Sequence, residues 1–269
     1  MLTYREHKVE GFLAEHIKKL WVLDNSAGNL PENGKAVLPN GCFNLAIVDG
    51  NGARIETCVA RFDLVNGPYF CGQMTKAVQV NVKPHTKITI IQLLPWVPSL
   101  ITDTDLSSLK DRIVPLPAVA DQVRILRRNG TYTDEQALIS KLQDKAPLML
   151  QGADEKATLK DIFSFILTSE ASITVKDLAL QAGISERLLQ KRFKQATGLS
   201  PKEYLKIIKL RATVDMLAYP EKEPQTGTTV AHNSDYYDQA HFINVFRNIT
   251  STTPKKFCPS DYYLTLKED

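Results

Sequence analysis

Cysteine is scarce in this chain of 269 residues, and its placement excludes two common kinds of site. The four cysteines, Cys42, Cys58, Cys71 and Cys258, form no C-x-x-C pair and have no histidine at a short spacing. Zinc sites are built from closely spaced cysteines and histidines, so we expect no zinc site. A disulfide framework is not expected either, and the cysteines are predicted to be free thiols in a reducing cytoplasm.

Long hydrophobic runs are also missing. The longest apolar stretch, 88–101, is interrupted by Gln92, Pro95 and Pro98. It is shorter than the roughly 20 residues that a membrane-spanning helix needs. The first residues, M-L-T-Y-R-E-H-K, lack the pattern of a secretory signal peptide. We therefore expect a cytoplasmic protein with no membrane partner.

Histidine is too sparse in the N-terminal part to favour a metal enzyme. Its histidines, His7, His16 and His85, are far apart in the sequence, and no histidine there is placed to activate a cysteine. A catalytic metal site needs several such ligands converging on one open position. We predict no enzymatic activity and no cofactor. Two alternatives stay open, namely a β-barrel metal enzyme fused to a DNA-binding module and a DNA-repair protein with a reactive cysteine.

Positive charge is in small excess and is concentrated near the C-terminus. The formal net charge is +3; residues 1–171 carry 19 Lys and Arg against 19 Asp and Glu, whereas residues 172–262 carry 13 against 9. Attraction to phosphate groups requires cations in the part that binds them. The distribution agrees with a nucleic-acid partner, although an excess of this size does not identify one.

An internal repeat lies in the cation-rich part. Segments 185–204 and 238–257 align without a gap at a shift of about 53 positions. Residues of like kind coincide in the two copies: Ser185 with Asp238, Leu189 with Phe242, Phe193 with Phe246, Thr197 with Thr250, Pro201 with Pro254, and Tyr204 with Phe257. Two similar units are expected to recognise two similar targets.

The first third of the chain predicts a small antiparallel β sandwich or barrel over residues 1–118. The sequence D-G-N-G at 49–52 is typical of a hairpin turn. A short helix leading into a strand is predicted at 16–21. Apolar or alternating runs predict strands at 43–48, 54–65, 78–82 and 88–94.

Helical periodicity begins near residue 118. Amphipathic helices are predicted at 119–128 and 134–145, followed by a linker at 146–155. Residues 119–155 thus form a connector to a C-terminal all-α domain at 156–269, which opens with a helix at 158–169. The predicted fold class is α+β. The caps and apolar stripes of the last domain predict that it folds by itself.

A helix-turn-helix pattern occupies the first copy of the repeat. Thr174 and Asp177 form an N-cap pair for a helix at 175–181, and Gly183 permits a left-handed turn. Ser185 then caps a second helix, in which Leu189 and Phe193 face inward. The sequence S-P-K-E at 200–203 starts a third helix, to about residue 218, which would hold two recognition helices at a fixed separation.

The second of these helices has an outward face suited to DNA. It carries Arg187, Gln190, Lys191 and Lys194. Arg and Lys bond to guanine and to phosphates, and Gln bonds to adenine, in the major groove. The alternative for these side chains is an ordinary solvated helix face.

Residues 158–263 resemble the AraC/XylS family of bacterial transcription regulators. The resemblance rests on I-T-V-K-D-L-A-L-Q-A-G-I-S-E-R-L-L-Q-K-R-F-K-Q-A-T-G-L-S-P-K-E-Y in the first unit, and on Y-Y-D-Q-A-H-F-I-N-V-F-R and T-P-K-K-F in the second. It implies that DNA is read by Arg187, Gln190 and Lys191 in the first unit, and by Gln239, Ala240, His241 and Asn244 in the second. The N-terminal part, with L-P-N-G at 38–41, is similar to the β-rich sensor domains of some members.

This resemblance implies a sequence-specific transcription regulator that is controlled by a small ligand or by dimerisation through its N-terminal domain. The expected partners are double-stranded DNA, a small-molecule effector, a second copy of the chain and RNA polymerase.

The second unit departs from the family pattern. The helix expected at 226–235 contains Gly227 and several threonines, which have poor helix propensity. Asp235 and Ser251 stand where the family usually has glycine, in positions that favour a left-handed backbone. For His241 a local packing role stays open. A further alternative for the whole chain is therefore a protein-interaction module whose second helix-turn-helix is degraded.

Overall fold

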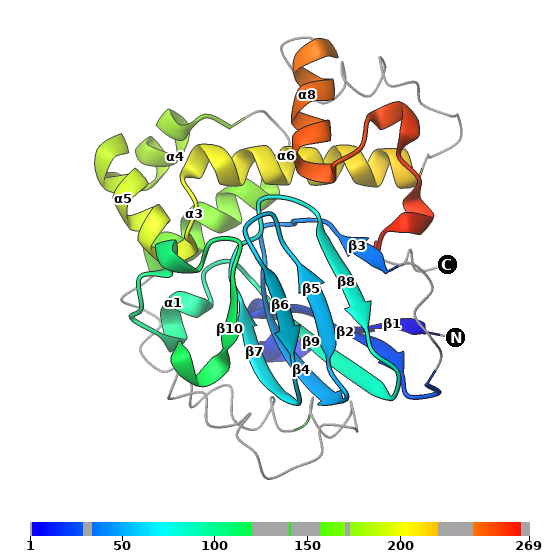
Figure 1. The fold of residues 1–269 in the computed structure, drawn as a ribbon. Helices are drawn as coiled ribbons and strands as arrows, with labels where there is room; N and C mark the ends of the chain where they lie inside the picture. Colours follow the sequence, from blue (N-terminus) through cyan, green and yellow to red (C-terminus); the bar gives the residue numbers. More distant parts are fainter. Residues whose placement is uncertain are drawn as a thin grey trace.

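The computed structural model describes residues 2–28, 34–119, 140, 157–169, 173–219 and 239–264. A β-rich N-terminal part lies below a group of helices (Figure 1), which confirms the predicted α+β class. The helices expected at 119–128 and 134–145, the linker at 146–155 and the segment 226–235 lie outside the described residues, apart from residues 119 and 140.

Within the described residues, ten strands form two antiparallel sheets. Their order is β1-β2-β9-β4-β7-β10 in one sheet and β3-β8-β5-β6 in the other. The strands are β1 (Thr3–Lys8), β2 (Ile17–Asn25), β3 (Lys35–Val37), β4 (Phe43–Gly50), β5 (Ala53–Glu56), β6 (Arg61–Leu64), β7 (Gly67–Cys71), β8 (Val78–Val82), β9 (Thr86–Leu93) and β10 (Ile113–Pro115). The predicted strands at 43–48, 78–82 and 88–94 are confirmed.

The predicted hairpin at residues 49–52 is wrong. Strand β4 pairs with β7 and β9, whereas β5 pairs with β6 and β8. Because both edges of β4 are already occupied, the chain passes to the other sheet at this turn. Gly50 and Gly52 have φ values of 114° and 96°, which explains why glycine stands at both positions.

Two other strand predictions need correction. Residues 54–65 form two strands, β5 and β6, joined by a turn in which the Thr57 N–H donates to the Ala60 carbonyl at 2.9 Å. The short helix expected at 16–21 is wrong, because residues 17–21 belong to strand β2, which begins at Ile17; the helical element of this region is a 3₁₀ turn, η1 (Gly11–Glu15), that comes before it. Leu20 to Leu23 are all buried because β2 is covered on both faces. Such an unbroken apolar run does not distinguish a strand from a helix.

Two cores lie on opposite faces of the larger sheet. Trp21, Ala46 and Ile90 face the smaller sheet and pack with Ile55 and Val80. Their neighbours in the strands, such as Leu20, Leu45 and Ile91, face the other side and join a core that also contains helical residues. We call residues 2–28 and 34–119 the β domain.

The helical part confirms the expected elements closely. The helices are α1 (Pro98–Ile101), α3 (Ala157–Thr168), α4 (Val175–Gln181), α5 (Glu186–Thr197), α6 (Pro201–Ala218) and α8 (Gln239–Thr250), with 3₁₀ turns η2 (Leu106–Leu109), η3 (Leu116–Ala118), η6 (Pro254–Lys256) and η7 (Pro259–Asp261). Leu167, near the C-terminal end of α3, is 49% exposed, whereas Ile162, Phe163 and Ile166 of the same helix are buried. Among the described residues, no helix is both long and apolar enough to cross a membrane.

Helix α6 is the axis of the helical part. Near its start, Tyr204 is buried against Phe163 and Phe193, with ring centroids 5.2 and 5.5 Å away. Farther along, Leu210 and Val214 belong to the core that contains α8. The first and second units therefore pack on successive parts of one rod, as the sequence predicts.

The β domain shares both of these helical cores. The Trp96 ring lies 6.3 Å from Phe163, and Leu38 is buried in the core of α8. At Gly41 the contact is close, since a Cβ there would lie 2.8 Å from the Tyr204 ring. Folding of residues 156–269 by themselves stays a prediction, but the described structure places part of their core in the β domain.

Candidate nucleic-acid interface

The first helix-turn-helix unit is fixed by three local devices. Thr174 and Asp177 form a capping box, in which the Asp177 N–H donates to Thr174 Oγ1 at 3.2 Å and the Thr174 N–H donates to Asp177 Oδ2 at 2.9 Å. Gly183 turns the chain with a φ of 63°. Ser185 Oγ then accepts a hydrogen bond from the Leu188 N–H at 3.3 Å and caps α5. These contacts set the direction in which α5 leaves the turn.

Helix α5 presents a polar face to solvent. Leu189 and Phe193 are fully buried, so the rotation of the helix about its axis is fixed. The predicted DNA-reading side chains are all exposed: Arg187, Gln190, Lys191 and Lys194. The structure therefore brings these four residues to one accessible helix face.

Helix α8 is the corresponding helix of the second unit. Phe242, Phe246 and Ile249 are buried against α6 and its neighbours. The four predicted residues of this unit are exposed in its N-terminal half: Gln239, Ala240, His241 and Asn244. The described part of α8 has one cation, Arg247, whereas α5 has four.

The two recognition helices end in the same way. Thr197 Oγ1 donates to the Phe193 carbonyl, and Thr250 Oγ1 donates to the Phe246 carbonyl, both at 2.8 Å. Each threonine oxygen also accepts from the N–H two residues later, at 3.1 and 3.3 Å. The internal repeat of the sequence is thus a repeat of structure down to its helix ends.

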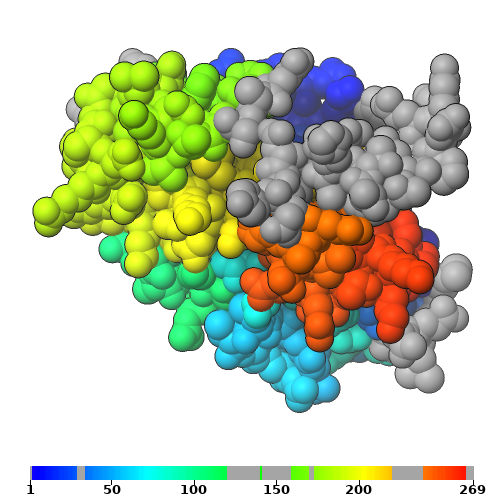
Figure 2. Space-filling view, turned by 90° about the horizontal axis from the view of Figure 1, so that it is seen from above, coloured from blue at the N-terminus to red at the C-terminus, as the bar shows by residue number. Residues whose placement is uncertain are grey.

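The β domain contacts both helices at these C-terminal ends. The turn η2 packs against α5, and a Cβ on Gly198 would lie 2.7 Å from the Leu106 carbonyl oxygen. For α8, the Ala77 N–H of the β domain donates to the Ile249 carbonyl at 2.7 Å. The N-terminal end of α8 points away from the β domain (Figure 1), and the first unit and α8 reach the surface on the same face (Figure 2). The β domain therefore contacts the C-terminal ends of α5 and α8, and the exposed candidate residues of their N-terminal parts lie away from these contacts.

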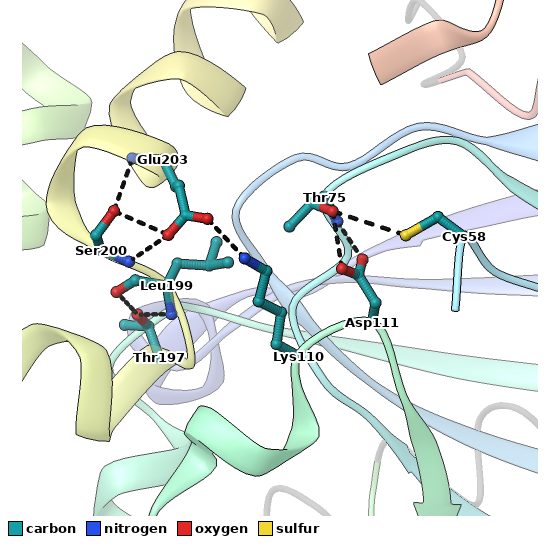
Figure 3. A network of polar contacts seen from close by, with 8 residues as sticks. All are labelled: Cys58, Thr75, Lys110, Asp111, Thr197, Leu199, Ser200 and Glu203. Atoms are coloured by element: carbon teal, nitrogen blue, oxygen red, sulfur yellow. Dashed lines mark hydrogen bonds and ion pairs between the residues drawn. The ribbon is translucent and has the colours of Figure 1, made fainter. Parts of the chain in front are cut away.

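A polar network joins the β domain to the start of α6 (Figure 3). Lys110 Nζ donates to Glu203 Oε1 at 2.6 Å, while Glu203 Oε2 accepts from the Ser200 N–H at 2.9 Å. Burial alone would raise the pKa of Glu203, but the bonds from Lys110 and Ser200 outweigh it and lower the pKa to about 2. The next residue, Asp111, binds Thr75 through the backbone N–H and the hydroxyl. Lys110 and Asp111 thus tie α6 to the body of the β domain.

A cavity of about 460 Å³ lies between the β domain and the first unit. Its walls come from the segment around η2, from α3 and from the inner side of α5, with Asp103, Asp105 and Arg192 among the lining residues. Because both parts of the molecule line it, its volume depends on how the β domain sits against α5.

Three exposed lysines were not singled out by the sequence reasoning. Lys202 lies in the first turn of α6, and Lys255 and Lys256 lie in η6, so each group follows a recognition helix. The repeat already aligns Pro201-Lys202 with Pro254-Lys255, and this was the available signal. Cations at such positions are suited to bind phosphates beside a major groove.

Three of the four cysteines have surroundings that disfavour the thiolate form. Burial raises the pKa of Cys71 to about 12 and also raises the pKa of Cys42. Burial and the carboxylate of Asp111 raise the pKa of Cys58. A raised pKa disfavours the reactive thiolate. In the described ranges no three His, Cys, Asp or Glu side chains are grouped so that they could hold a metal ion.

Comparisons with known proteins agree with this geometry. Residues 178–258 match the family model of a helix-turn-helix domain (HTH_18), and residues 5–115 match that of a domain of unknown function (DUF6597). The HTH-type transcriptional activator RhaS of Klebsiella pneumoniae is 26% identical over 136 residues, which are 47% of this chain and 48% of that protein. The chain thus spans about half the length of the curated relatives it matches.

Solved structures of similar proteins include whole chains and single domains. ToxT from Vibrio cholerae, 8% identical, covers 95% of this chain and 96% of its own with a TM-score of 0.46. An AraC-type DNA-binding domain protein from Chromobacterium violaceum, 23% identical, covers 39% of this chain and 92% of its own with a TM-score of 0.34. The predicted resemblance of the C-terminal part to AraC/XylS regulators is confirmed by the family model and by the match to the transcriptional activator RhaS.

Proposed function

We propose that the protein is a sequence-specific, double-stranded-DNA-binding transcription regulator of the cytoplasm and that it catalyses no reaction. The observation that carries the proposal is the pair of recognition helices, α5 and α8. They share their C-terminal caps, expose polar N-terminal faces, and contact the β domain at their C-terminal ends. Helix-turn-helix proteins read bases with the N-terminal part of such a helix.

The exposed side chains divide into two roles under this proposal. Arg187 and Gln190 are of the types that bond to guanine and adenine edges, so they are assigned to base reading. Lys194, Lys202 and Lys255 are assigned to phosphates, where they position the protein without reading sequence. The second unit is assigned to read its half of the site with Gln239, His241 and Asn244, whose side chains are two amides and an imidazole.

The β domain is proposed to control the arrangement of the two helices. It contacts the end of α5 through Leu106, the start of α6 through Lys110, and the end of α8 through Ala77. A small molecule or a second copy of the chain that binds to the β domain would therefore shift the C-terminal ends of α5 and α8 together. Pairing of two chains would also raise the effective concentration of each DNA-binding unit.

Selection of bound sequences tests the DNA-binding proposal. The full chain is mixed with fragmented genomic DNA of its source, and bound fragments are sequenced after washing at two salt concentrations. A shared sequence, bound at least about a thousandfold more tightly than random DNA, is the expected result. Fragments without a common sequence, or no binding even at low salt, would refute the proposal and favour the alternative of a protein-interaction module.

Sedimentation at micromolar concentration, with and without the selected DNA, tests control by pairing. Dimers that form through the β domain or through residues 119–145 are the expected species. A chain that remains monomeric on DNA, and whose thermal stability no metabolite shifts, would leave the β domain without the proposed role.

A further inference from the structure

The chain returns to the β domain after α8. Residues 257–264, which we call the C-terminal latch, run from the end of η6 to the edge strand β3 (Figure 1). Tyr262 forms a parallel bridge with Ala36, and the Tyr263 N–H donates to the Ala36 carbonyl at 2.8 Å. Since β3 pairs with β8 on its other side, the latch covers the free edge of this sheet.

The side chain of Tyr263 enters the sandwich between the two sheets. Its ring lies 5.4 Å from Tyr4 and 6.5 Å from Trp21, while Tyr4 and Trp21 meet edge to face at 5.8 Å. Lys35 Nζ lies 5.9 Å from the Tyr263 ring centroid. The latch therefore completes an aromatic cluster whose other members come from β1 and β2, at the side of the sandwich where the edge strands β1 and β3 lie.

The fit of Tyr263 leaves polar atoms unpaired. Trp21 and Tyr263 are 6% and 8% exposed, yet neither Trp21 Nε1 nor the Tyr263 hydroxyl has a hydrogen-bond partner among the described residues. Burial also raises the pKa of Tyr263 to about 12, so the unpaired group is a neutral hydroxyl at ordinary pH. Buried donors without partners destabilise the state that holds them. Tyr263 thus fills the space by ring packing and leaves the Trp21 donor unsatisfied.

The latch is also connected to the second recognition helix. The Tyr262 hydroxyl donates to the Thr250 carbonyl at 3.1 Å, in the last residue of α8. The Phe257 ring packs 5.6 Å from Phe246 and 5.0 Å from Tyr262. Movement of Tyr263 out of the sandwich would therefore remove support from the end of α8.

We propose that the space filled by Tyr263 is the effector site of the β domain, that its ligand is a small uncharged phenol, and that this ligand replaces Tyr263 and frees the end of α8. A phenol offers the ring that Tyr4 and Trp21 already accept, and its oxygen accepts the hydrogen bond that Trp21 Nε1 lacks. An uncharged molecule suits this space because burying a charge between the sheets is costly. The regulatory part of this inference rests on the proposed function, whereas the binding part does not.

Titration with p-cresol, which is the tyrosine side chain as a free molecule, tests the binding part. The full chain is compared with Tyr263→Ala, with the milder Tyr263→Leu and with Tyr69→Ala, a matched truncation elsewhere in the β domain. Calorimetry gives the affinities. Tryptophan fluorescence then locates the ligand. The chain has two tryptophans, so in a Trp96→Phe background all tryptophan emission comes from Trp21, and a change in it places p-cresol near Trp21.

Tyr263→Ala is expected to bind p-cresol at least tenfold more tightly than the unaltered chain and to change Trp21 emission, because the competing side chain is gone. The p-cresol affinity of Tyr263→Leu should lie between those of Tyr263→Ala and the unaltered chain, and the affinity of Tyr69→Ala should equal that of the unaltered chain. If Tyr263→Ala does not fold, the inference is decided by whether Tyr263→Leu binds p-cresol more tightly than the unaltered chain does. Equal affinities throughout, or no binding to either variant, would overturn the inference.

DNA binding separates the two proposals. Saturating p-cresol should change the affinity of the unaltered chain for its selected DNA by roughly 5- to 150-fold, the usual range for coupled sites. Tyr263→Ala should show this change without the ligand. If the variants bind p-cresol in the expected order of affinity but the protein binds no DNA, the proposed function is refuted and the p-cresol site stands. Sequence-specific DNA binding that neither p-cresol nor Tyr263→Ala alters would overturn the regulatory role of the latch.

Discussion

Gly198 and Ser251 occupy the same place in the two helix-turn-helix units, with φ values of 80° and 65°. Each residue follows the threonine that ends a recognition helix, and each holds the left-handed conformation that lets the chain leave the helix. Gly198 is also approached closely by the β domain, since a Cβ there would lie 2.7 Å from the Leu106 oxygen, whereas Ser251 is exposed to solvent. The second unit has therefore kept the geometry with a residue that the first unit does not have room for.

Ser251→Gly is expected to stabilise the protein. A left-handed backbone costs a residue with a Cβ about 1–2 kcal/mol, and part of this gain is offset by the greater freedom of glycine in the unfolded chain. We predict a net rise of about 0.5–1 kcal/mol in the free energy of unfolding, measured by urea denaturation. No change, or a loss, would show that serine is held there by contacts that the left-handed position does not explain.

Gly198→Ala should destabilise the protein more than Gly183→Ala does. Both glycines have positive φ, but a Cβ at Gly183 would meet no atom within 4 Å, so that variant isolates the backbone cost. We predict a loss of about 1 kcal/mol for Gly183→Ala and about 2–4 kcal/mol for Gly198→Ala, where steric overlap with Leu106 adds to the backbone cost. If urea denaturation shows that the two variants lose equal free energy of unfolding, the turn η2 moves aside from Gly198→Ala without cost.

Stability should depend on pH through Glu203. Its pKa in the folded protein is about 2, below its usual value of 4.5, so its contribution is present above pH 4.5 and is lost as the pH falls toward 2. Glu203→Gln keeps the cap acceptor but removes the charge that faces Lys110. Because the pair is partly exposed, we expect this variant to lose only about 0.5–1 kcal/mol at pH 7. The difference should shrink steadily as the pH falls from 4.5 toward 2; a difference independent of pH would show that the charge of Glu203 does not matter.

Substitutions on α5 should separate base reading from phosphate binding. Arg187→Ala and Gln190→Ala are each expected to cost about 1–3 kcal/mol of binding to the selected site and to relax preference at one base position. Lys194→Ala should weaken selected and random DNA alike and reduce the salt dependence. Competition binding with substituted sites measures both effects. Equal losses of Arg187→Ala on selected and random DNA would show that Arg187 does not read bases.

The sequence predicts the local structure of the helical part well because its signals are local. Thr174 with Asp177 and Ser200 with Glu203 define helix starts within four residues, and both capping boxes are present. The exposure of Arg187 and Gln190 follows from the burial of Phe193 on the opposite face. Periodicity and capping act inside one helix, so they are readable without knowledge of the fold.

Contacts between distant segments could not be read in the same way. The D-G-N-G turn has the residues of a hairpin, but pairing of β4 with β7 and β9 depends on strands far along the chain. Nothing near Lys110 or Tyr263 in the sequence indicates that they contact α6 and the sandwich. Two hydrophobic cores contain residues of both the β domain and the helices, and no local sequence pattern predicts this contact.

High-resolution footprinting of the full chain on its selected DNA tests the central claim most directly. Two recognition helices held on one rod predict two protected major-groove segments on one face of the duplex, about one helical turn or 10–10.5 base pairs apart. Arg187→Ala with Gln190→Ala should remove protection from one segment, and Gln239→Ala with Asn244→Ala from the other. Protection of a single segment that α8 substitutions do not alter, or protection without sequence preference, would contradict the account of two DNA-reading helices.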